Sequence, residues 1–354
     1  MSELTSIDYH RVSDALSYVV AHEPMTRDRP GNGGLRLLPY TTDGAMIADA
    51  YELNKRMRIK HRLYNTGFSG AKIVARGAPT AETKVELLEH LATTLGGYDG
   101  RLYTGCDLNT TEEDMVQLGQ RSPYVLAGLG VRVDASRATG VGVYASARVV
   151  AQGQSVRYLV HGVGAVGREV VDRLVADGHR VWTVDRDTAR AQRPGAIAVD
   201  AEGPWWTTPH DVLVLCSASG LLTPQMAEVL PCWAVVSGAN APFSDEAQVK
   251  EILRRRGLAW IHDAVCSAGA VIVDSVEHYA PHAWPELAAA TLYDFVEAHI
   301  RRKSQIFLDQ REAGLNDETN LQQLIDDASS SPIGQLLANL AQGSKDDPSE
   351  AMAV

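Results

Sequence analysis

Long apolar runs, a basic stripe and paired cysteines are all absent from this sequence of 354 residues. Without a run of about 18 apolar residues, we expect no segment to cross a membrane as a helix. The net charge of -11 argues against a nucleic-acid partner, because nucleic acids are bound through basic surfaces. The first ten residues, MSELTSIDYH, contain neither the basic nor the apolar region of a secretory signal, so we expect a cytoplasmic protein.

The cysteines are few and widely spaced, with no CxxC pair. A disulfide framework or a structural zinc site requires cysteines at close, recurrent spacings. We therefore expect reduced thiols and no metal site. The four residues are Cys106, Cys216, Cys232 and Cys266.

The length and composition indicate two domains of an ordinary globular protein. A chain with 45% apolar and 22% charged residues can bury a core in each domain. Apolar residues recur at three- and four-residue spacing over residues 41–64, which predicts a helix, and the short apolar run 71–75 predicts a strand. Further helices are predicted over 82–95, from about 112 after a cap at Thr110 or Thr111, and over 139–150.

From Arg157 onward, short apolar runs alternate with helical stretches. This rhythm is typical of parallel strands buried on both faces. The predicted fold is therefore α/β in two domains: an N-terminal α/β substrate and oligomerisation domain, and a doubly wound Rossmann domain. The predicted limits are 1–134 for the first domain, 135–284 for the Rossmann domain, 285–330 for helices that pack back on the first domain, and 331–354 for a disordered tail rich in Ser, Gly, Asp and Pro.

A glycine-rich turn, GVGAVG, lies between a predicted strand and a predicted helix. Its first glycine permits a tight turn, the second lets backbone N–H groups approach a pyrophosphate, and the third lets helix and strand pack closely. A merely structural turn is the alternative. The predicted cofactor-binding residues of the turn are Gly162, Gly164, Ala165, Val166 and Gly167.

An acidic residue, Asp185, ends the next predicted strand, 18 residues after Gly167. A carboxylate at this place can hydrogen-bond the ribose hydroxyls of NAD and repels the 2′-phosphate of NADP. We therefore predict NAD, with NADP the less favoured cofactor. Arg186 follows directly and could weaken that preference; the alternative is a solvated arginine.

Two lysines, Lys60 and Lys72, lie twelve residues apart in the segment MRIKHRLYNTGFSGAKIVARG. Lys72 has few polar neighbours in sequence, so it either loses its proton easily or is matched by an anion. Lys60 has basic neighbours, and taken alone it is better interpreted as part of a solvated helix face. Together the pair indicates an enzyme that handles a small substrate with a carboxylate.

Several motifs in this order give the chain a family resemblance. They are GGLRLLPY at 33–40, MRIKH at 57–61, GFSGAKIV at 67–74, YTGCDLNTTEEDM at 103–115, TGVGVYAS at 139–146, the GVGAVG fingerprint, SGAN at 237–240 and SAGAVIVD at 267–274. With them, the chain resembles the glutamate/leucine/phenylalanine/valine dehydrogenase family over roughly residues 30 to 300.

The resemblance implies reversible oxidative deamination of an L-amino acid to a 2-oxo acid and ammonia, in a homo-oligomer. It assigns the substrate carboxylate to Lys60, the general base to Lys72 and proton transfer on the amino group to Asp107. A neutral lysine avoids a third positive charge beside the iminium and the cationic cofactor. Remaining residues implied at the site are Gly34 and Met57 for the substrate, and Thr139, Ala218 and Asn240 for the cofactor.

Two of these residues have simpler alternatives. Asp107 could be a turn-forming residue before NTTEED, and Thr139 could bond a backbone carbonyl within its helix. His262 beside Asp263 is interpreted as a strand-end histidine in a turn instead of an acid–base pair.

The motifs also depart from the family pattern, at Ser267, Ala270 and Ala241. By that pattern, Val271 and Asp274 face the substrate side chain. A carboxylate opposite a hydrocarbon is unfavourable, so Asp274 suggests a polar or cationic side chain. The alternative is that Asp274 turns to solvent or caps the next helix.

Two other functions stay open on the sequence. One is an imine or modified-amino-acid reductase of the same fold in specialised metabolism. The other is a regulatory protein that binds NAD without turnover.

Overall fold

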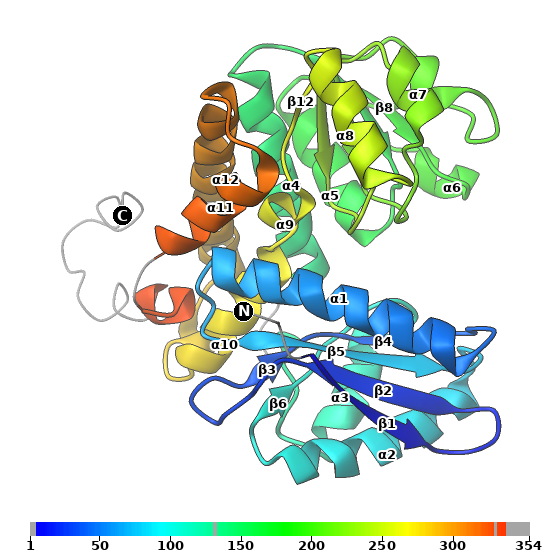
Figure 1. The fold of residues 1–354 in the computed structure, drawn as a ribbon, viewed down its shortest axis with the longest axis vertical. Coiled ribbons are helices and arrows are strands. Elements are labelled where there is room, and N and C mark those ends of the chain that lie inside the picture. The colour runs from blue at the N-terminus through cyan, green and yellow to red at the C-terminus, as the bar shows by residue number, and fades with distance from the viewer. Residues whose placement is uncertain (1–4, 130–132, 329–330, 338–354) are drawn as a thin grey trace. The chain divides into compact units, whose positions relative to one another are not determined.

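The computed structural model describes residues 5–129, 133–328 and 331–337 and divides into two compact units (Figure 1). The described part of unit 1 comprises residues 5–129, 133, 274–287, 328 and 331–337, and that of unit 2 comprises 134–273 and 288–327. Each unit has its own sheet, and the predicted α/β class is confirmed. The limits predicted for the domains stay a prediction.

The sheet of unit 1 is mixed, with strand order β1-β2-β5-β3-β6 and β4 beside β5. Its central strand β5 runs antiparallel to β2 and parallel to β3 and β4. The sequence predicted the strand that became β5, and the family resemblance implied a strand within residues 33–40, where β4 lies. The strands are β1 (Ser6–Arg11), β2 (Ser17–His22), β3 (Gly31–Asn32), β4 (Leu35–Leu38), β5 (Ser69–Arg76) and β6 (Leu102–Tyr103).

Helices cover both faces of this sheet. Along β5, Ile73 packs in a cluster with the leucines of α2 (Ala81–Tyr98), whereas Val74 packs with α1 (Asp43–Leu63). Successive side chains of a strand point to opposite faces. Lys72 therefore shares the α1 face with Val74, the face on which the helix that carries Lys60 lies.

Helix α3 (Glu112–Gly119) begins with a complete capping box. Thr111 Oγ1 accepts from Asp114 N at 3.3 Å, and Thr111 N donates to Asp114 Oδ2 at 2.8 Å. Two otherwise unpaired N–H groups at the helix start are satisfied in this way. Thr111 is therefore the N-cap, out of the two threonines predicted for that role.

The sheet of unit 2 is parallel, with order β12-β11-β10-β7-β8-β9. This is the Rossmann order, in which the chain reverses direction across the sheet between β7 and β10. The strands are β7 (Arg157–His161), β8 (Arg180–Val184), β9 (Ile197–Ala198), β10 (Val212–Leu215), β11 (Ala234–Ser237) and β12 (Ala259–Trp260).

Helices on both faces complete unit 2, and α11 packs along α4 within it. Helix α10 (Gly269–Tyr279) begins in unit 2 and continues into unit 1 from Asp274. The other helices are α4 (Ala135–Ala151), α5 (Ala165–Ala176), α6 (Thr188–Ala191), α7 (Pro224–Val229), α8 (Glu246–Arg255), α9 (Asp263–Cys266), α11 (Ala289–Glu312) and α12 (Asp317–Asp326), with short 3-10 turns at Trp205–Thr207 and Trp284–Glu286.

The predicted disordered tail, 331–354, is wrong for its first residues. Residues 333–337 are helical, and Ile333 and Leu337 are buried in unit 1. Ile333 N donates to Asn65 O at 2.8 Å. The apolar side chains of this turn bury apolar surface, which stabilises it. The average composition of the tail did not indicate this burial. The disorder predicted for 338–354 concerns residues outside those described.

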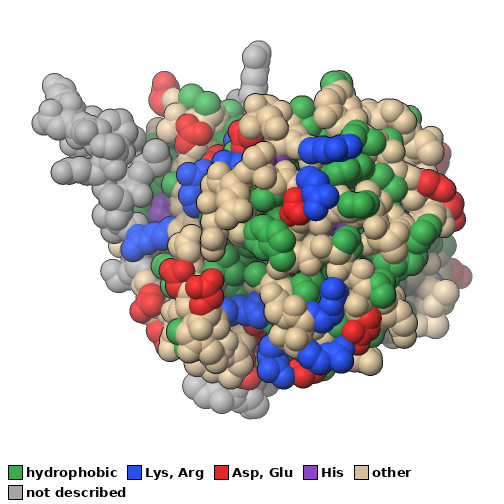
Figure 2. Space-filling view, turned by 90° about the horizontal axis from the view of Figure 1, so that it is seen from above, with side chains coloured by type: hydrophobic (Ala, Val, Ile, Leu, Met, Phe, Trp, Pro, Cys, Tyr) green, Lys and Arg blue, Asp and Glu red, His purple; other side chains and the backbone are tan. Residues whose placement is uncertain are grey.

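Figure 2 shows one face of the molecule, where basic and acidic side chains lie intermixed among apolar ones. Among the described residues on this face, no broad field of one charge sign is seen. A surface of this kind gives little long-range steering of a highly charged partner. In the described part of the chain, every helix is too short or too polar to span a membrane.

Candidate active site

Lys72 and Asp107 form a buried ion pair in unit 1. Lys72 Nζ lies 2.8 Å from Asp107 Oδ2, and the lysine side chain is 7% exposed. Arg36 Nε donates to the same carboxylate oxygen at 2.9 Å, and Arg36 Nη1 donates to Asp49 Oδ2 at 3.0 Å. Tyr40 completes the chain of contacts by donating its hydroxyl to Asp49. The structure thus brings together the two residues predicted to be catalytic.

Burial lowers the pKa of Lys72, and the nearby Arg36 charge acts in the same direction, whereas Asp107 opposes both. The net direction is downward, so the neutral amine is easier to form here than in water. Burial by itself raises the pKa of Asp107, but the charges of Lys72 and Arg36 outweigh it and hold that pKa well below its ordinary value. The carboxylate is therefore ionised beside a lysine that gives up its proton easily.

Position 34 requires a glycine because the loop that carries Asp107 lies against it. A Cβ atom built on Gly34 would lie 2.5 Å from the carbonyl oxygen of Cys106 and 3.1 Å from Asp107 Cβ. Any larger residue would push this loop away, because a real Cβ does not tolerate such contacts. Gly34 therefore sets the distance of the Asp107 loop from β4.

Lys60 is buried on the last turns of α1, with 7% of its surface exposed, and Met57 lies half-buried one turn earlier. The same part of α1 crosses β5 closely, since a Cβ on Gly70 would lie 2.8 Å from the backbone nitrogen of Arg58. The alternative of a fully solvated helix face is therefore wrong for Lys60. Its predicted role toward a carboxylate stays a prediction.

Asp274 lies inside α10 and so caps no following helix, which rules out one alternative for it. Burial and the neighbouring Glu277 raise the pKa of Asp274 well above its ordinary value, and Asn32 and Lys72 act against this rise. Asp274, Lys72 and Asn32 all belong to unit 1. Val271, predicted beside it, belongs to unit 2, where it is buried with 4% exposure.

The glycine-rich turn of unit 2 has the geometry of a phosphate site. Gly162 has φ +91°, and a Cβ on Gly167 would lie 1.9 Å from the carbonyl oxygen of Gly162. Gly164 is the N-cap of α5 and no side chain caps that helix, while the space above Gly164 is open. No side chain caps the first N–H groups of α5, from Ala165 and Val166 onward. These groups can therefore donate hydrogen bonds to an anion.

Asp185 stands at the end of β8 and reaches the glycine-rich turn. Its Oδ2 accepts from Val163 N at 2.7 Å and its Oδ1 from Asp187 N at 2.9 Å. These bonds fix the carboxylate while leaving lone pairs on both oxygens for hydroxyl donors. The residues present therefore fit a dinucleotide. Arg186 is exposed, in keeping with the solvated alternative for it.

The hydroxyl of Thr139 both donates and accepts a hydrogen bond. Its hydroxyl donates to Ala135 O at 3.1 Å within α4, and it accepts from Ala270 N at 3.2 Å. The simpler alternative, a bond to a backbone carbonyl, is thus present. The hydroxyl also ties α4 to the start of α10. Its predicted contact with the nicotinamide stays a prediction.

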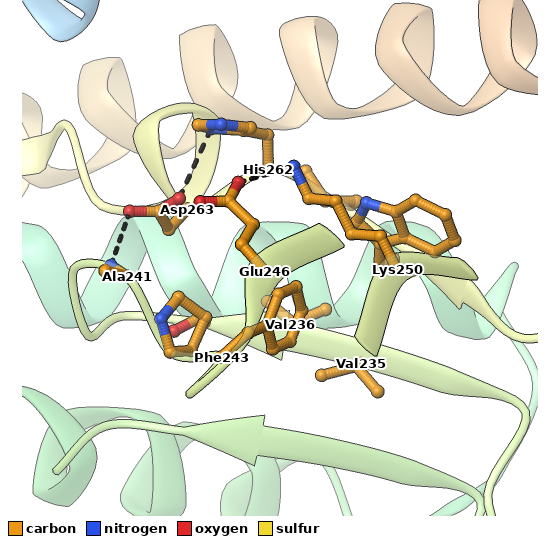
Figure 3. A pocket seen from close by; sticks show the side chains of 12 residues that line it. Val235, Val236, Ala241, Phe243, Glu246, Lys250, His262 and Asp263 are labelled. Atoms are coloured by element: carbon orange, nitrogen blue, oxygen red, sulfur yellow. Dashed lines mark hydrogen bonds and ion pairs between the residues drawn. The ribbon is translucent and has the colours of Figure 1, made fainter. Parts of the chain in front are cut away.

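The loop after β11, which contains Asn240, is held from two sides. Asn240 O accepts from Ser219 Oγ at 2.7 Å. Ala241 N donates to the buried Asp263 Oδ2 at 3.2 Å (Figure 3). Ala241 has φ +47°, a conformation that alanine rarely adopts. Ala218 is exposed in the loop after β10. The carboxylate of Asp263 therefore helps keep the Asn240 loop in its shape.

His262 is a helix cap. Its Nδ1 accepts from Ala264 N at 3.1 Å at the start of α9. A ring nitrogen that accepts from a backbone N–H carries no proton of its own, so it cannot also donate to Asp263. The interpretation of His262 as a strand-end residue in a turn is confirmed. In the described residues, no group of three His, Cys, Asp or Glu side chains is placed to hold a metal.

Known proteins share both the sequence pattern and the fold. Residues 186–288 match the family model described as glutamate/leucine/phenylalanine/valine dehydrogenase. The chain is 29% identical over 272 residues to a phenylalanine dehydrogenase of Caldalkalibacillus thermarum, covering 72% of this chain and 73% of that one. It is 29% identical over 259 residues to a valine dehydrogenase of Streptomyces coelicolor, with 69% and 71% covered. The chain is thus similar to the glutamate/leucine/phenylalanine/valine dehydrogenases, at less than 30% identity to the two relatives named here.

Solved structures of related enzymes have the same fold. The L-tryptophan dehydrogenase from Nostoc punctiforme superposes with a TM-score of 0.69 at 20% identity, covering 94% of this chain and 96% of that one. A hetero-hexameric glutamate dehydrogenase from Thermus thermophilus gives a TM-score of 0.75 at 18% identity, with 97% and 90% covered. The resemblance predicted from the motifs is thereby confirmed. Because the relatives are named for different amino acids, their names do not select one side chain.

Three residues at this family site were not predicted as functional. Arg36 was inside a quoted motif, and its contact with Asp107 could have been suspected from that arginine alone. Asn32 and Glu277 gave no such signal. Glu277 lies one turn after Asp274 on α10, whereas Asn32 lies on β3, far from Asp274 in the sequence.

Proposed function

We propose that this protein is an NAD-dependent L-amino acid dehydrogenase that catalyses reversible oxidative deamination to a 2-oxo acid and ammonia. The observation that carries the proposal is the buried contact of Lys72 with Asp107, 2.8 Å between Nζ and Oδ2. A general base and a proton carrier are the two groups that this reaction requires of the protein. The likeness to amino acid dehydrogenases supports the same reaction.

Lys72 is proposed as the general base. NAD, when bound at the glycine-rich turn, would supply the hydride acceptor for the substrate α-carbon, and Lys72 acts on the iminium that results. Lys72, in its neutral form, then removes a proton from the water that adds to this carbon. Burial and Arg36 lower the pKa of Lys72, so the neutral amine is present at a lower pH than for a solvated lysine.

Asp107 is proposed to exchange the proton on the substrate amino group. Its carboxylate is ionised and held by Arg36 Nε at 2.9 Å. The negative charge offsets the positive charge that develops on the substrate nitrogen. Arg36 is a positioning residue, since its guanidinium pairs with the carboxylates of Asp107 and Asp49.

Lys60 is proposed to bind the substrate carboxylate, with Met57 and the backbone at Gly34 beside it. A fixed carboxylate orients the α-carbon for hydride transfer, which is worth several powers of ten in rate when the alignment is good. Lys60 is buried on the last turns of α1, one turn after Met57.

The cofactor is proposed to be NAD rather than NADP. The support is Asp185, whose carboxylate stands at the end of β8 beside the glycine-rich turn. By family likeness, Thr139, Ala218 and Asn240 help to place the nicotinamide. We also propose a homo-oligomer; one structural relative is described as hetero-hexameric.

The substrate side chain is proposed to be polar or cationic, on the evidence of Asp274. Burial raises the pKa of this carboxyl, and Lys72 is one of its neighbours. A hydrocarbon side chain would leave such a group without a partner. Val271, from unit 2, is the second residue proposed for the side chain.

The reaction is tested with purified protein by following NADH at 340 nm. A panel of L-amino acids with NAD should give reduction, and the matching 2-oxo acids should give NADH oxidation only when ammonium is added. An imine reductase would oxidise NADH with a cyclic imine and without ammonium. A regulatory protein would bind NAD and turn over nothing. Either result would contradict the proposal.

A further inference from the structure

Arg36 lies between two carboxylates and bonds each of them through a different nitrogen. Its Nε donates to Asp107 Oδ2 at 2.9 Å, and its Nη1 donates to Asp49 Oδ2 at 3.0 Å. The third nitrogen of the guanidinium, Nη2, makes no hydrogen bond with the described residues. Because the guanidinium is a rigid plane, bonds at two separate nitrogens fix its orientation as well as its position.

The alternation of side chains along β4 directs Arg36 to the α1 face of the sheet. Leu35 and Leu37 pack with the leucines of α2, so the Arg36 side chain between them points to the opposite face. Asp49 meets it there from α1, and Asp107 comes from the loop after β6. The two carboxylates therefore reach Arg36 from different elements of unit 1.

Tyr40 holds the carboxylate of Asp49. Its hydroxyl donates to Asp49 Oδ2, the same oxygen that accepts from Arg36 Nη1. The Tyr40 ring packs against the α1-face cluster that contains Val74, and Tyr40 N donates to Leu38 O at 2.9 Å at the end of β4. Both the ring and the backbone of Tyr40 are held, so Asp49 has little freedom to turn away from Arg36.

The two cations that bond Asp107 meet on one of its carboxylate oxygens. Lys72 Nζ, at 2.8 Å, and Arg36 Nε both lie on Oδ2, and Oδ1 receives no hydrogen bond from the described residues. An arginine paired with a carboxylate frequently bonds both oxygens through two parallel N–H groups. Nη2 is on the same side of the guanidinium as Nε, so it is the donor that would complete such a pair. Because Asp49 holds Nη1, the guanidinium stays in an orientation in which this second bond does not form.

We propose that Asp49 and Tyr40 are positioning residues that limit Arg36 to a single bond with Asp107 and so keep Asp107 Oδ1 open for the substrate amino group. This rests on the proposed deamination, in which Asp107 exchanges the proton of that amino group. Without Asp49, the guanidinium turns until Nη2 reaches Oδ1. Asp107 then has no oxygen free of a cation to accept a proton from the substrate.

The kinetic test measures kcat of the full-length protein with its best L-amino acid, and NAD affinity by calorimetry. Asp49→Ala should lower kcat about 30-fold and leave NAD affinity within about twofold, because a reacting group misplaced by about 1 Å costs up to about 100-fold in rate. Asp49→Asn should bring kcat back to within about 5-fold of the parent, since one amide oxygen can accept from both Arg36 and Tyr40.

A double variant decides whether Asp49 acts through Arg36. In the Arg36→Gln protein, Asp49 has no guanidinium to hold, so adding Asp49→Ala should lower kcat by less than about twofold further. Losses that multiply in the double variant would show that Asp49 acts independently of Arg36 and would overturn the proposal.

Asp43→Ala is the matched control. Asp43 also lies on α1 and also accepts from an arginine and a tyrosine, Arg76 Nε at 2.5 Å and the Tyr9 hydroxyl at 2.9 Å. Its loss should leave kcat near the parent value. An equal fall of kcat in Asp43→Ala and Asp49→Ala would contradict a specific role of Asp49.

Tyr40→Phe covers the case in which Asp49→Ala does not fold, since it removes one oxygen and keeps the packed ring. It should lower kcat about 3-fold in the parent and leave it unchanged in the Arg36→Gln protein, whereas Tyr9→Phe should change neither. If no L-amino acid is oxidised, the deamination proposal fails, and crystal structures of Asp49→Ala and Tyr40→Phe decide the role of Asp49 separately. Arg36 bonded to both Asp107 oxygens in either variant supports that role, and an unchanged Arg36 in each overturns it.

Discussion

At the scale of single residues, the chemistry of this protein depends on how burial and neighbouring charges set the protonation of a few groups. Lys72, Asp107 and Arg36 form the densest of these sets, with one carboxylate oxygen shared by both cations. An isolated lysine at that depth would lose its proton, and an isolated carboxylate would gain one. Each group has its observed state because the others are present.

Arg36→Gln should move the pH dependence of amino acid oxidation to higher pH. The Arg36 charge lowers the pKa of Lys72, so its removal raises that pKa, and the neutral base then appears only at higher pH. We expect the midpoint of kcat/KM against pH to rise by about one unit and the plateau to fall about 10-fold. Arg76→Gln is the control, because Arg76, on the neighbouring strand β5, pairs with Asp43 at 2.5 Å. An unchanged midpoint would contradict this role of Arg36.

Glu277→Gln should remove part of the pH dependence of stability. Burial raises the pKa of Glu277 from 4.5 to about 7, with the Gly128 N–H opposing. A raised folded-state pKa gives stability that is complete below about pH 4.5 and is lost as pH rises through 7. The variant should therefore be more stable than the parent by about 1–3 kcal/mol at pH 8 and equal to it at pH 5.

Urea unfolding at the two pH values measures this difference. Glu251→Gln is the control, since Glu251 is exposed on α8 and its pKa is lowered by Arg254, so it stays ionised over this range. A Glu277→Gln variant that loses stability equally at both pH values would show a structural role without the predicted titration.

At the scale of helices and strands, local signals predicted the elements well when the signal was complete within one segment. The periodic residues 41–64 became α1, and Thr111 caps α3 as one of the two predicted threonines. The strands of residues 6–22 were missed, because a strand in a mixed sheet is defined by its pairing with distant segments. The helical turn at 333–337 was missed because few apolar residues stand among many polar ones.

The residues of the site also divide into those that the sequence could predict and those that it could not. Lys72 and Asp107 could be predicted because each lies in a motif, and the motifs keep their order in this chain. The effect of Asn32 on the pKa of Asp274 could not, because Asn32 lies on β3 and Asp274 on α10, more than two hundred residues apart in the sequence.

Thr111→Ala tests the capping box of α3. Loss of the side-chain oxygen leaves Asp114 N without its acceptor, and we expect unit 1 to lose about 1 kcal/mol of unfolding free energy. Thr93→Ala is the matched control: Thr93 is exposed within α2, and its hydroxyl is 3.5 Å from Glu89 O. That change should leave stability within about 0.5 kcal/mol. Equal effects of the two substitutions, measured by thermal unfolding, would contradict the capping account.

At the scale of the whole molecule, the two units carry different parts of the proposed reaction. The acid and base groups belong to unit 1, and the dinucleotide groups belong to unit 2. Variants in one unit should therefore change one property and leave the other. A variant that fails to fold would lose both properties. This separation therefore distinguishes a specific effect from a loss of folding.

Asp185→Ser should change the choice of cofactor and nothing in the acid–base chemistry. Removal of the carboxylate weakens binding of the ribose hydroxyls and relieves repulsion of a 2′-phosphate. We expect the preference of kcat/KM for NAD over NADP to fall by about 10-fold or more, with the pH midpoint unchanged. Kinetics with both cofactors measure the preference. A parent enzyme that already favours NADP would show that the role given to Asp185 is wrong.

The most direct test of the central claim compares NAD binding and amino acid turnover in Lys72→Ala. The account predicts that NAD affinity, followed by calorimetry, stays within about twofold of the parent, while kcat falls by about 100- to 10,000-fold, the range expected for loss of a general base. Lys84→Ala, which removes a lysine paired with Asp114 in the same unit, should keep kcat near the parent value. A Lys72→Ala enzyme that retains a tenth or more of the parental kcat would contradict the account.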